Sequence, residues 1–190
     1  FEELKFLYEK YRFKEIAFVD DTFLINKKRI KELFRLLDKE DIKFYWSCMA
    51  RVNNVDYEFL RFLKDHGCWR ISFGIESGDE MILRLIKKNI DLDQVRQVVE
   101  WCNMLNIKAS GFFIIGHPGE TEDTIDKTID LACSLKLDNA VFTLNTPIPG
   151  SEQYDTASVY GRMEDTDWAR FNYWRPVFVP KGLTEEKLIS

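Results

Sequence analysis

Polar residues suited to binding a small charged molecule stand at or just after five apolar, β-prone runs of this sequence. In chain order they are Asp20 and Asp21, then Ser47 and Arg51, then Glu76 and Ser77, then His117 between Gly116 and Pro118, and finally Asn145 two residues before Pro147. Imidazole is suited to proton transfer near neutral pH. Helix starts that follow such runs offer unpaired N–H groups to an anion such as phosphate or carboxylate.

Each of these residues also has a plainer structural interpretation. The aspartates after the first run, and the Glu76-Ser77 pair, can simply cap the helices that follow. The Gly116–Gly119 segment can serve only to shape a turn. Arg51 can be a solvated charge and His117 an ordinary loop side chain. The occurrence of polar residues at five run ends favours the functional interpretation.

The elements that must position these residues alternate along the chain. Strands are predicted at Ile16–Val19, Phe44–Cys48, Trp69–Ile75, Ala109–Ile115 and Ala140–Leu144. Helices are predicted at Phe1–Lys14, at Lys27–Lys39, from an Asp56 cap to Gly67, at Asp79–Lys88, at Leu92–Leu105 and from a Thr121 cap onward. Such alternation predicts an α/β fold with a mostly parallel sheet. The carboxyl ends of parallel strands share one face, where ligands bind.

The pattern breaks after Leu144 and the remaining tail is aromatic and irregular. We therefore expect a core over residues 1–150 and a C-terminal aromatic extension over residues 151–190. Its aromatic residues include Trp168, Phe171, Tyr173, Trp174 and Phe178. They either dock a partner or pack on the core, and packing is favoured because exposed aromatic patches of that size are uncommon in monomers.

The composition and charge of the chain limit the classes of protein to which it can belong. With 45% apolar residues over 190 positions, the chain is predicted to be globular. A net charge of −5 argues against sequence-independent binding of nucleic acid, which needs a basic surface. No apolar run approaches the roughly 18 residues of a membrane helix, and no signal peptide is recognisable. We expect a cytoplasmic protein.

The four cysteines of the chain are too widely spaced for a thiolate metal motif and are expected to be small buried hydrophobic residues. They are Cys48, Cys68, Cys102 and Cys133.

Five short motifs together resemble those of radical S-adenosylmethionine (SAM) enzymes, in the same order. They are Asp20-Asp21-Thr22-Phe23, Cys48-Met49-Ala50-Arg51-Val52, Gly74-Ile75-Glu76-Ser77-Gly78, Gly116-His117-Pro118-Gly119-Glu120-Thr121 and Thr146-Pro147-Ile148-Pro149-Gly150. The resemblance covers nearly the whole chain. It is strongest to the branch whose members often carry an N-terminal cobalamin-binding domain.

The resemblance implies a partial TIM-type (β/α)6 barrel, open on one side, that binds SAM and a [4Fe–4S] cluster. In this family a Cys-x-x-x-Cys-x-x-Cys loop holds the cluster, and an electron from an external donor leads to cleavage of SAM to methionine and a 5′-deoxyadenosyl radical. This chain lacks that motif. We therefore expect a fragment that lacks the first strand and the cluster loop and is inactive alone. The cluster and a candidate cobalamin would belong to the full-length protein, whose substrate stays unknown.

The resemblance also implies roles for individual residues. Asp20 and Asp21 would bind or support the SAM amino group. Arg51 and Lys88 would bind its carboxylate, and Glu76, with Ser77 beside it, would contact the ribose. Residues 116–118 and 145–147 would flank the adenine, largely through backbone groups. One departure is Phe112, which stands where some relatives place a polar ribose ligand.

Two other classes of function remain open at this point. One is an α/β-barrel enzyme without iron–sulfur chemistry that binds a phosphorylated metabolite at the helix starts after Gly78 and Gly119. The other is a non-catalytic interaction module that uses the aromatic tail. The isolated fragment is also expected to self-associate, because a missing first βα unit exposes apolar surface.

Overall fold

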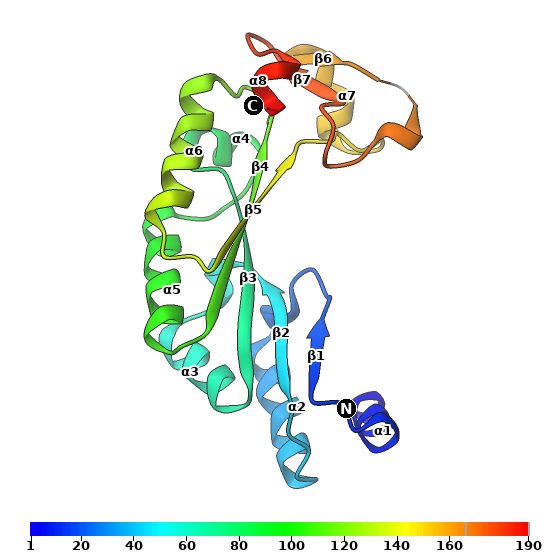
Figure 1. Ribbon diagram of the computed structural model, residues 1–190, viewed down its shortest axis with the longest axis vertical. Coiled ribbons are helices and arrows are strands. Elements are labelled where there is room, and N and C mark those ends of the chain that lie inside the picture. Colours follow the sequence, from blue (N-terminus) through cyan, green and yellow to red (C-terminus); the bar gives the residue numbers. More distant parts are fainter. Residues whose placement is uncertain (166, 190) are drawn as a thin grey trace. The chain divides into compact units, whose positions relative to one another are not determined.

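The computed structural model describes residues 1–165 and 167–189, in which strands and helices alternate in an α/β fold (Figure 1). Five strands form one sheet in the order β1-β2-β3-β4-β5. They are β1 (Glu15–Phe18), β2 (Tyr45–Ala50), β3 (Cys68–Glu76), β4 (Lys108–Ile115) and β5 (Asn139–Leu144). The pairs β1–β2 and β2–β3 are parallel. The predicted α/β fold with a mostly parallel sheet is therefore confirmed.

The helices lie before β1, between the strands and in the tail. They are α1 (Glu2–Tyr11), α2 (Lys27–Lys39), α3 (Tyr57–Asp65), α4 (Glu80–Leu85), α5 (Leu92–Met104), α6 (Glu122–Ser134), α7 (Glu152–Tyr160) and α8 (Glu185–Ile189). Helix α2 has the predicted bounds. Its start is capped by Asn26, whose side chain accepts the Arg29 N–H at 3.0 Å.

The predicted caps of α3 and α6 are confirmed. The Asp56 carboxylate accepts the Phe59 N–H at 2.8 Å. Thr121 forms a reciprocal capping box with Thr124. Helix α6 buries Ile125 and Ala132, whereas its Ile129 is 43% exposed.

Helix α4 is shorter than the predicted Asp79–Lys88. Lys87 has a left-handed φ of 58°, and the Lys88 N–H donates to the Leu83 carbonyl at 2.8 Å. This arrangement closes the helix as a Schellman-type end. Lys88 consequently lies outside the helix.

The described chain consists of two compact units. Unit 1 contains residues 1–74, 93–111 and 136–139, and unit 2 contains residues 75–92, 112–135 and 140–190 except for the two residues not described. The boundary falls within β3, β4 and β5, so each unit holds a part of these strands. The predicted division at residue 150 stays a prediction.

An aromatic core fills unit 1. Trp46 is fully buried and stacks on Phe34 with ring centroids 5.1 Å apart. Phe18 and Phe23 also pack edge-on against it. The Trp46 indole N–H donates to the His66 carbonyl at 2.8 Å, so the buried ring has its polar group satisfied.

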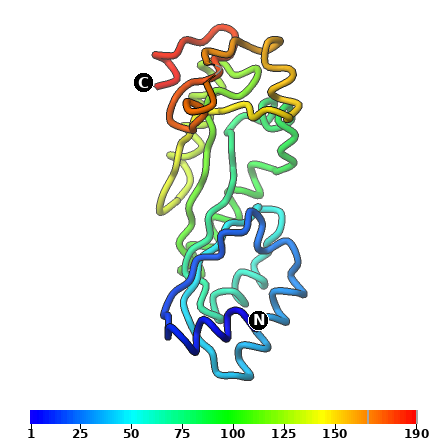
Figure 2. The backbone as a smooth tube through the Cα atoms, turned by 90° about the vertical axis from the view of Figure 1, so that its right-hand side faces the viewer, coloured from blue at the N-terminus to red at the C-terminus, as the bar shows by residue number. Residues whose placement is uncertain are grey.

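The tail folds back within unit 2 (Figure 2). Strands β6 (Gly161–Met163) and β7 (Phe178–Pro180) pair antiparallel. An apolar cluster of unit 2 contains Ile115 at the end of β4, Ile125 of α6, and Val179, Leu183 and Leu188 of the tail. The end of β4 is thus buried by aliphatic residues of the tail, whereas Trp168, Tyr173 and Trp174 are exposed.

Two further sequence-based expectations are wrong, and one alternative is excluded. Ser47 does not stand at a strand end, because β2 continues to Ala50 and buries Ser47 within it. Cys133 is exposed, although the other three cysteines are buried. The capping alternative for Asp20 and Asp21 fails, because Thr22 and Asn26 begin the helical segments that follow β1.

Among the described residues, no helix combines the length and the apolar character that crossing a membrane requires.

Candidate functional site

A strained turn ends β3 in unit 2. Glu76 has a left-handed φ of 70°, and the Ser77 N–H donates to the Ile75 carbonyl at 3.0 Å. This i→i+2 hydrogen bond around a residue with positive φ is the pattern of the rare, strained γ-turn. Strained residues of this kind cluster at binding sites, where surrounding contacts hold them in place.

The Glu76 carboxylate contacts Lys88. Their Oε1 and Nζ atoms are 2.7 Å apart, and the side chains are 18% and 19% exposed, respectively. The early end of α4 leaves Lys88 outside the helix, and its side chain forms this pair. The pair places one cation and one anion in a largely buried position.

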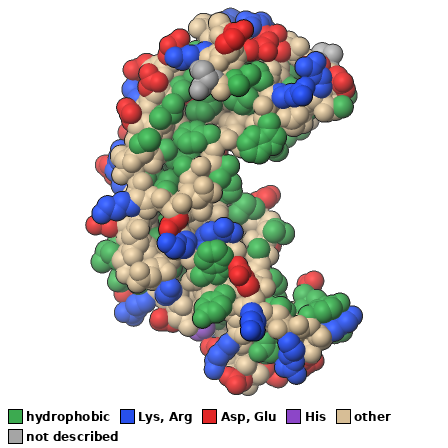
Figure 3. Space-filling view, viewed as in Figure 1, with side chains coloured by type: hydrophobic (Ala, Val, Ile, Leu, Met, Phe, Trp, Pro, Cys, Tyr) green, Lys and Arg blue, Asp and Glu red, His purple; other side chains and the backbone are tan. Residues whose placement is uncertain are grey.

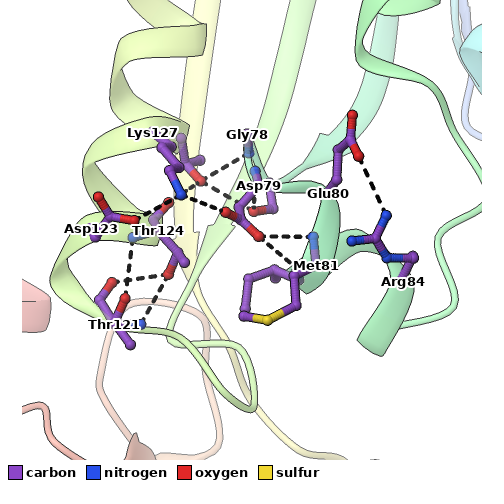
Figure 4. A network of polar contacts seen from close by, with 12 residues as sticks. Gly78, Asp79, Glu80, Met81, Arg84, Thr121, Asp123, Thr124 and Lys127 are labelled. Carbon is purple, nitrogen blue, oxygen red and sulfur yellow. Dashed lines mark hydrogen bonds and ion pairs between the residues drawn. The ribbon is translucent and has the colours of Figure 1, made fainter.

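The Ser77-Gly78-Asp79 segment packs on α6 (Figure 4). The Ser77 hydroxyl lies 3.2 Å from the Thr128 hydroxyl, which also accepts the Gly78 N–H at 2.9 Å. A Cβ atom on Gly78 would lie 2.4 Å from the Lys127 carbonyl oxygen, so only glycine fits there. The capping alternative for Glu76 and Ser77 is wrong, because the N-cap of α4 is Asp79.

Asp79 also binds Lys127 of α6, at 3.1 Å (Figure 4). Burial acts to raise the pKa of the Asp79 carboxyl, but hydrogen bonds from Lys127, Ile82 and Met81 hold that pKa below its usual value. The charged carboxylate therefore ties the start of α4 to α6. It fixes the loop that carries Ser77.

The loop after β4 is organised by a buried carboxylate. Glu120 is almost fully buried, and its Oε2 atom accepts the N–H groups of Gly116 and, at 3.0 Å, His117. Burial raises the pKa of Glu120 to about 7, against the lowering effect of those two N–H donors. Our sequence-based set of site residues missed Glu120. Its position directly after the Gly-His-Pro-Gly turn was the available signal.

His117 is buried rather than a solvated loop side chain. It is 4% exposed, and neither ring nitrogen has a hydrogen-bond partner among the described residues. Burial, followed by the positive charge of Lys88, lowers the pKa of His117 to about 4. The imidazole is therefore neutral at pH 7 and offers one donor and one acceptor.

The segment after β5 lies beside the end of β4. The Asn145 N–H donates to the Ile115 carbonyl at 2.7 Å. Asn145 is buried, and its amide nitrogen has no partner within the described chain. Pro118 and Pro147 are also buried. Unit 2 thus brings residues 116–118 and 145–147 to neighbouring strand ends.

Three predicted residues lie in unit 1. Asp20 and Asp21 are exposed and follow β1, whereas Arg51 directly follows β2. Because β1 and β2 pair in parallel, these residues follow the carboxyl ends of neighbouring strands. The Nε atom of Arg51 is buried and lacks a partner among the residues that the structure describes.

No cluster-binding group is present in the described ranges. They contain no set of three or more His, Cys, Asp or Glu side chains that could hold a metal ion. Burial raises the pKa values of Cys48 and Cys102 to about 12, and that of Cys68 well above its usual value. These thiols are therefore protonated, whereas iron–sulfur ligation needs thiolates. The described residues do not fit a [4Fe–4S] cluster.

The fold is that of an α/β core with polar residues after the carboxyl ends of its strands, which is where ligands bind in such folds. The family model of the Radical SAM superfamily matches residues 1–132. An uncharacterized methyltransferase of Pyrococcus horikoshii is 35% identical over 98% of this chain and 41% of its own length. The bacteriochlorophyllide d C-12(1)-methyltransferase of Chlorobaculum tepidum is 27% identical over 96% of this chain and 39% of its length.

A solved structure extends the comparison. The radical SAM methyltransferase TsrM of Kitasatospora setae, with cobalamin and a [4Fe–4S] cluster bound, matches with a TM-score of 0.73 and 17% identity, over 83% of this chain and 30% of that chain. The chain belongs to the radical SAM superfamily, whose members use SAM and a [4Fe–4S] cluster. It spans about two fifths of the length of the two methyltransferases named above, 41% and 39%.

Proposed function

We propose that this chain provides the SAM-binding surface of a radical SAM methyltransferase. The observation that carries the proposal is a set of buried polar groups at adjoining strand ends of unit 2. The ring nitrogens of His117 and the amide nitrogen of Asn145 lack partners among the described residues, and Glu76 pairs with Lys88. Buried polar groups normally have hydrogen-bond partners, so unpaired ones favour a ligand.

The chemistry of these groups fits the parts of SAM. Lys88 suits the carboxylate, and Glu76 suits the ribose hydroxyls, which donate hydrogen bonds to a carboxylate. Neutral His117 and Asn145 suit a nucleobase edge, which presents donors and acceptors together. The roles of Asp20 and Asp21 at the amino group, and of Arg51 at the carboxylate, stay predictions that the family resemblance supports.

The proposed reaction belongs to the whole protein. In this family the cluster supplies the electron that cleaves bound SAM to methionine and a 5′-deoxyadenosyl radical. Because the described residues do not fit a cluster, we expect this chain alone to bind SAM without cleaving it. Methyl transfer is supported by the names of two relatives. A cobalamin cofactor and an external electron donor are further expectations for the whole protein.

The alternative of a phosphorylated ligand is disfavoured by charge. The start of α4 carries Asp79 and Glu80, and the first turn of α6 carries Glu122 and Asp123. These carboxylates already occupy the positive ends of the helix dipoles, where a phosphate would have to bind. A phosphate at either position would meet like charge.

Calorimetric titration with SAM tests the binding surface. We expect saturable binding that Lys88→Ala weakens by roughly ten- to a hundredfold, because a charge-assisted contact contributes roughly 1.5–3 kcal/mol. Lys87→Ala is the matched control, since Lys87 is the exposed neighbour and pairs with Glu152. Equal losses in both variants, or no SAM binding by the protein, would contradict the assignment.

The reaction itself is tested on the full-length protein with a reconstituted cluster. After reduction in the presence of SAM, we expect 5′-deoxyadenosine in the full-length protein and none in the isolated chain. The absence of both 5′-deoxyadenosine and iron–sulfur absorbance in the full-length protein would refute the radical reaction. Product formation by the isolated chain would refute its inactivity.

A further inference from the structure

A cavity of about 510 Å³ lies in unit 1 at the amino ends of β1, β2 and β3. Its lining includes Lys14, Phe44 and Gly67, which directly precede these three strands. The strands are parallel neighbours in the sheet, so their amino ends lie side by side. The volume falls in the range of roughly 300–1,000 Å³ that small-molecule sites have.

This cavity and the proposed SAM contacts of unit 1 lie at opposite ends of the same strands. Asp20 and Asp21 follow the carboxyl end of β1, and Arg51 follows that of β2. In α/β barrels the carboxyl ends of the strands carry the catalytic residues. A ligand in the cavity would therefore bind apart from SAM.

Aromatic rings line the interior of the cavity. Phe34 and Phe44 are buried, and the Phe13 ring packs against Phe44 with centroids 5.1 Å apart and planes inclined by 62°. Tyr8 of α1 packs edge-on against Phe13, with centroids 5.6 Å apart. These contacts hold the rings in fixed orientations, and aromatic rings bind further rings by offset stacking or edge-to-face contact. The interior therefore suits a ligand with a flat ring.

Two cations of the lining flank Phe13 in the sequence. The Arg12 guanidinium lies over the Tyr8 ring, 5.7 Å from its centroid, and Lys14 is exposed. Neither side chain forms an ion pair with another described residue. Arg12 also has a left-handed φ of 49° where it ends α1, and strained residues of this kind cluster at ligand sites. In Figure 3 Lys and Arg side chains lie beside hydrophobic ones around α1.

The other charged side chains of the lining leave its total charge positive. The Lys43 ammonium pairs with Asp41 at 2.6 Å, and the Asp38 carboxylate lies 3.3 Å from the His66 Nε2 atom. Asp65, the last residue of α3, is exposed. The lining thus carries three Lys or Arg side chains and two carboxylates. An anionic group is favoured beside the two cations that have no ion-pair partner, because charge-assisted hydrogen bonds would form there.

We propose that this cavity is a second ligand site, which binds an aromatic ring that bears an anionic group. The ring would lie against Phe13 and Phe44, and the anionic group would contact Arg12 and Lys14. This site goes beyond the proposed function, because none of its residues belongs to the proposed SAM contacts.

Equilibrium dialysis of the full-length protein against naphthoate tests this inference. Naphthamide is the matched probe, because it keeps the ring and lacks the charge. We expect saturable binding of naphthoate and at least tenfold weaker binding of naphthamide. The double variant Arg12→Gln/Lys14→Gln should weaken naphthoate binding by about tenfold, because it removes two exposed charge contacts. It should leave naphthamide binding unchanged.

Lys10→Gln/Lys28→Gln is the control variant, because it removes the same charge from two exposed residues of unit 1 that do not line the cavity. It should bind naphthoate like the wild-type protein, and excess SAM should not displace the probe. No saturable binding of naphthoate, equal binding of naphthamide, or an equal loss in both double variants would overturn the inference. Displacement of naphthoate by SAM would show that the probe binds at the SAM contacts, and would overturn it too.

Discussion

The Lys88 ammonium lies 2.7 Å from the Glu76 carboxylate, and both side chains are about four-fifths buried. The family resemblance assigns these residues to different parts of SAM, the carboxylate and the ribose. In the protein they neutralise each other. A ligand that binds both must therefore replace, or share, an ion pair that already satisfies two buried charges. In the proposed site, this pair would hold both charged groups in position before SAM binds.

Glu76→Gln removes the anion and leaves the Lys88 ammonium buried without its partner. We expect the free energy of unfolding to fall by about 2 kcal/mol, because a hydrogen bond to a charged group contributes roughly 1.5–3 kcal/mol. Urea unfolding measures the loss. In the double variant Glu76→Gln/Lys88→Met no buried charge is left unpaired, so its loss should be smaller than the sum of the two single losses. Additive losses would show that the two side chains are not coupled.

The sequence predicted those features of the fold that depend on contacts between residues close together in the chain. The bounds of α2 and the caps at Asp56 and Thr121 follow from side chains within three residues of the helix start. The end of β2 did not follow from such rules. It is set by pairing of Met49 and Ala50 with Ser72 and Phe73 of β3. This pairing with a distant strand cannot be predicted from the residues of β2 alone.

The candidate site was predictable in position but not in its contacts. The runs of apolar residues indicated where strands end, and so placed Glu76, His117 and Asn145 at those ends. The pairing of Glu76 with Lys88 depends on the left-handed backbone of Lys87, which ends the helix. The sequence has no glycine at this position, so the usual signal for such a helix end is absent. The inward orientation of Glu120 depends on burial by the rest of unit 2, a property of the packed chain.

Glu120 and His117 should make stability depend on pH in opposite directions. The pKa of Glu120 is raised to about 7, so between its ordinary value and pH 7 the unfolded chain releases a proton that the folded chain keeps. Stability from this group is lost as the pH rises. The pKa of His117 is lowered to about 4, so stability from the imidazole is lost as the pH falls from about 6.5 to 4.

Substituting one of the two residues should leave only the other residue's contribution to the pH dependence of the free energy of unfolding. Glu120→Gln keeps an oxygen for the Gly116 and His117 N–H groups but does not titrate. Relative to the wild-type protein, its free energy of unfolding should rise between pH 4.5 and 7 by an amount on the order of 3 kcal/mol. His117→Gln should show the opposite trend. Chemical denaturation at several pH values measures both, and parallel pH profiles for the three proteins would contradict the assigned pKa directions.

Gly78→Ala tests the close approach between the loop after β3 and helix α6. The added Cβ would meet the Lys127 carbonyl oxygen at 2.4 Å, so the loop must move away from the helix. We expect a loss of about 1–3 kcal/mol in the free energy of unfolding, the usual cost of overpacking. Ser158→Ala on the exposed face of α7 is the control and should change stability by less than about 0.5 kcal/mol. Unchanged thermal unfolding of Gly78→Ala would mean that the contact is looser than the structure shows.

Thiol labelling distinguishes Cys133 from the three buried cysteines. Cys133 is exposed, whereas burial raises the pKa values of Cys48 and Cys102 to about 12 and that of Cys68 well above its usual value. A thiol reacts through its thiolate, so the buried groups should react only when the protein unfolds. With an aromatic disulfide reagent at pH 8, we expect a fast phase of one thiol per chain under native conditions and four thiols in denaturant. Cys133→Ser should abolish the fast phase. A fast phase that persists in this variant would show that another cysteine is accessible in the folded protein.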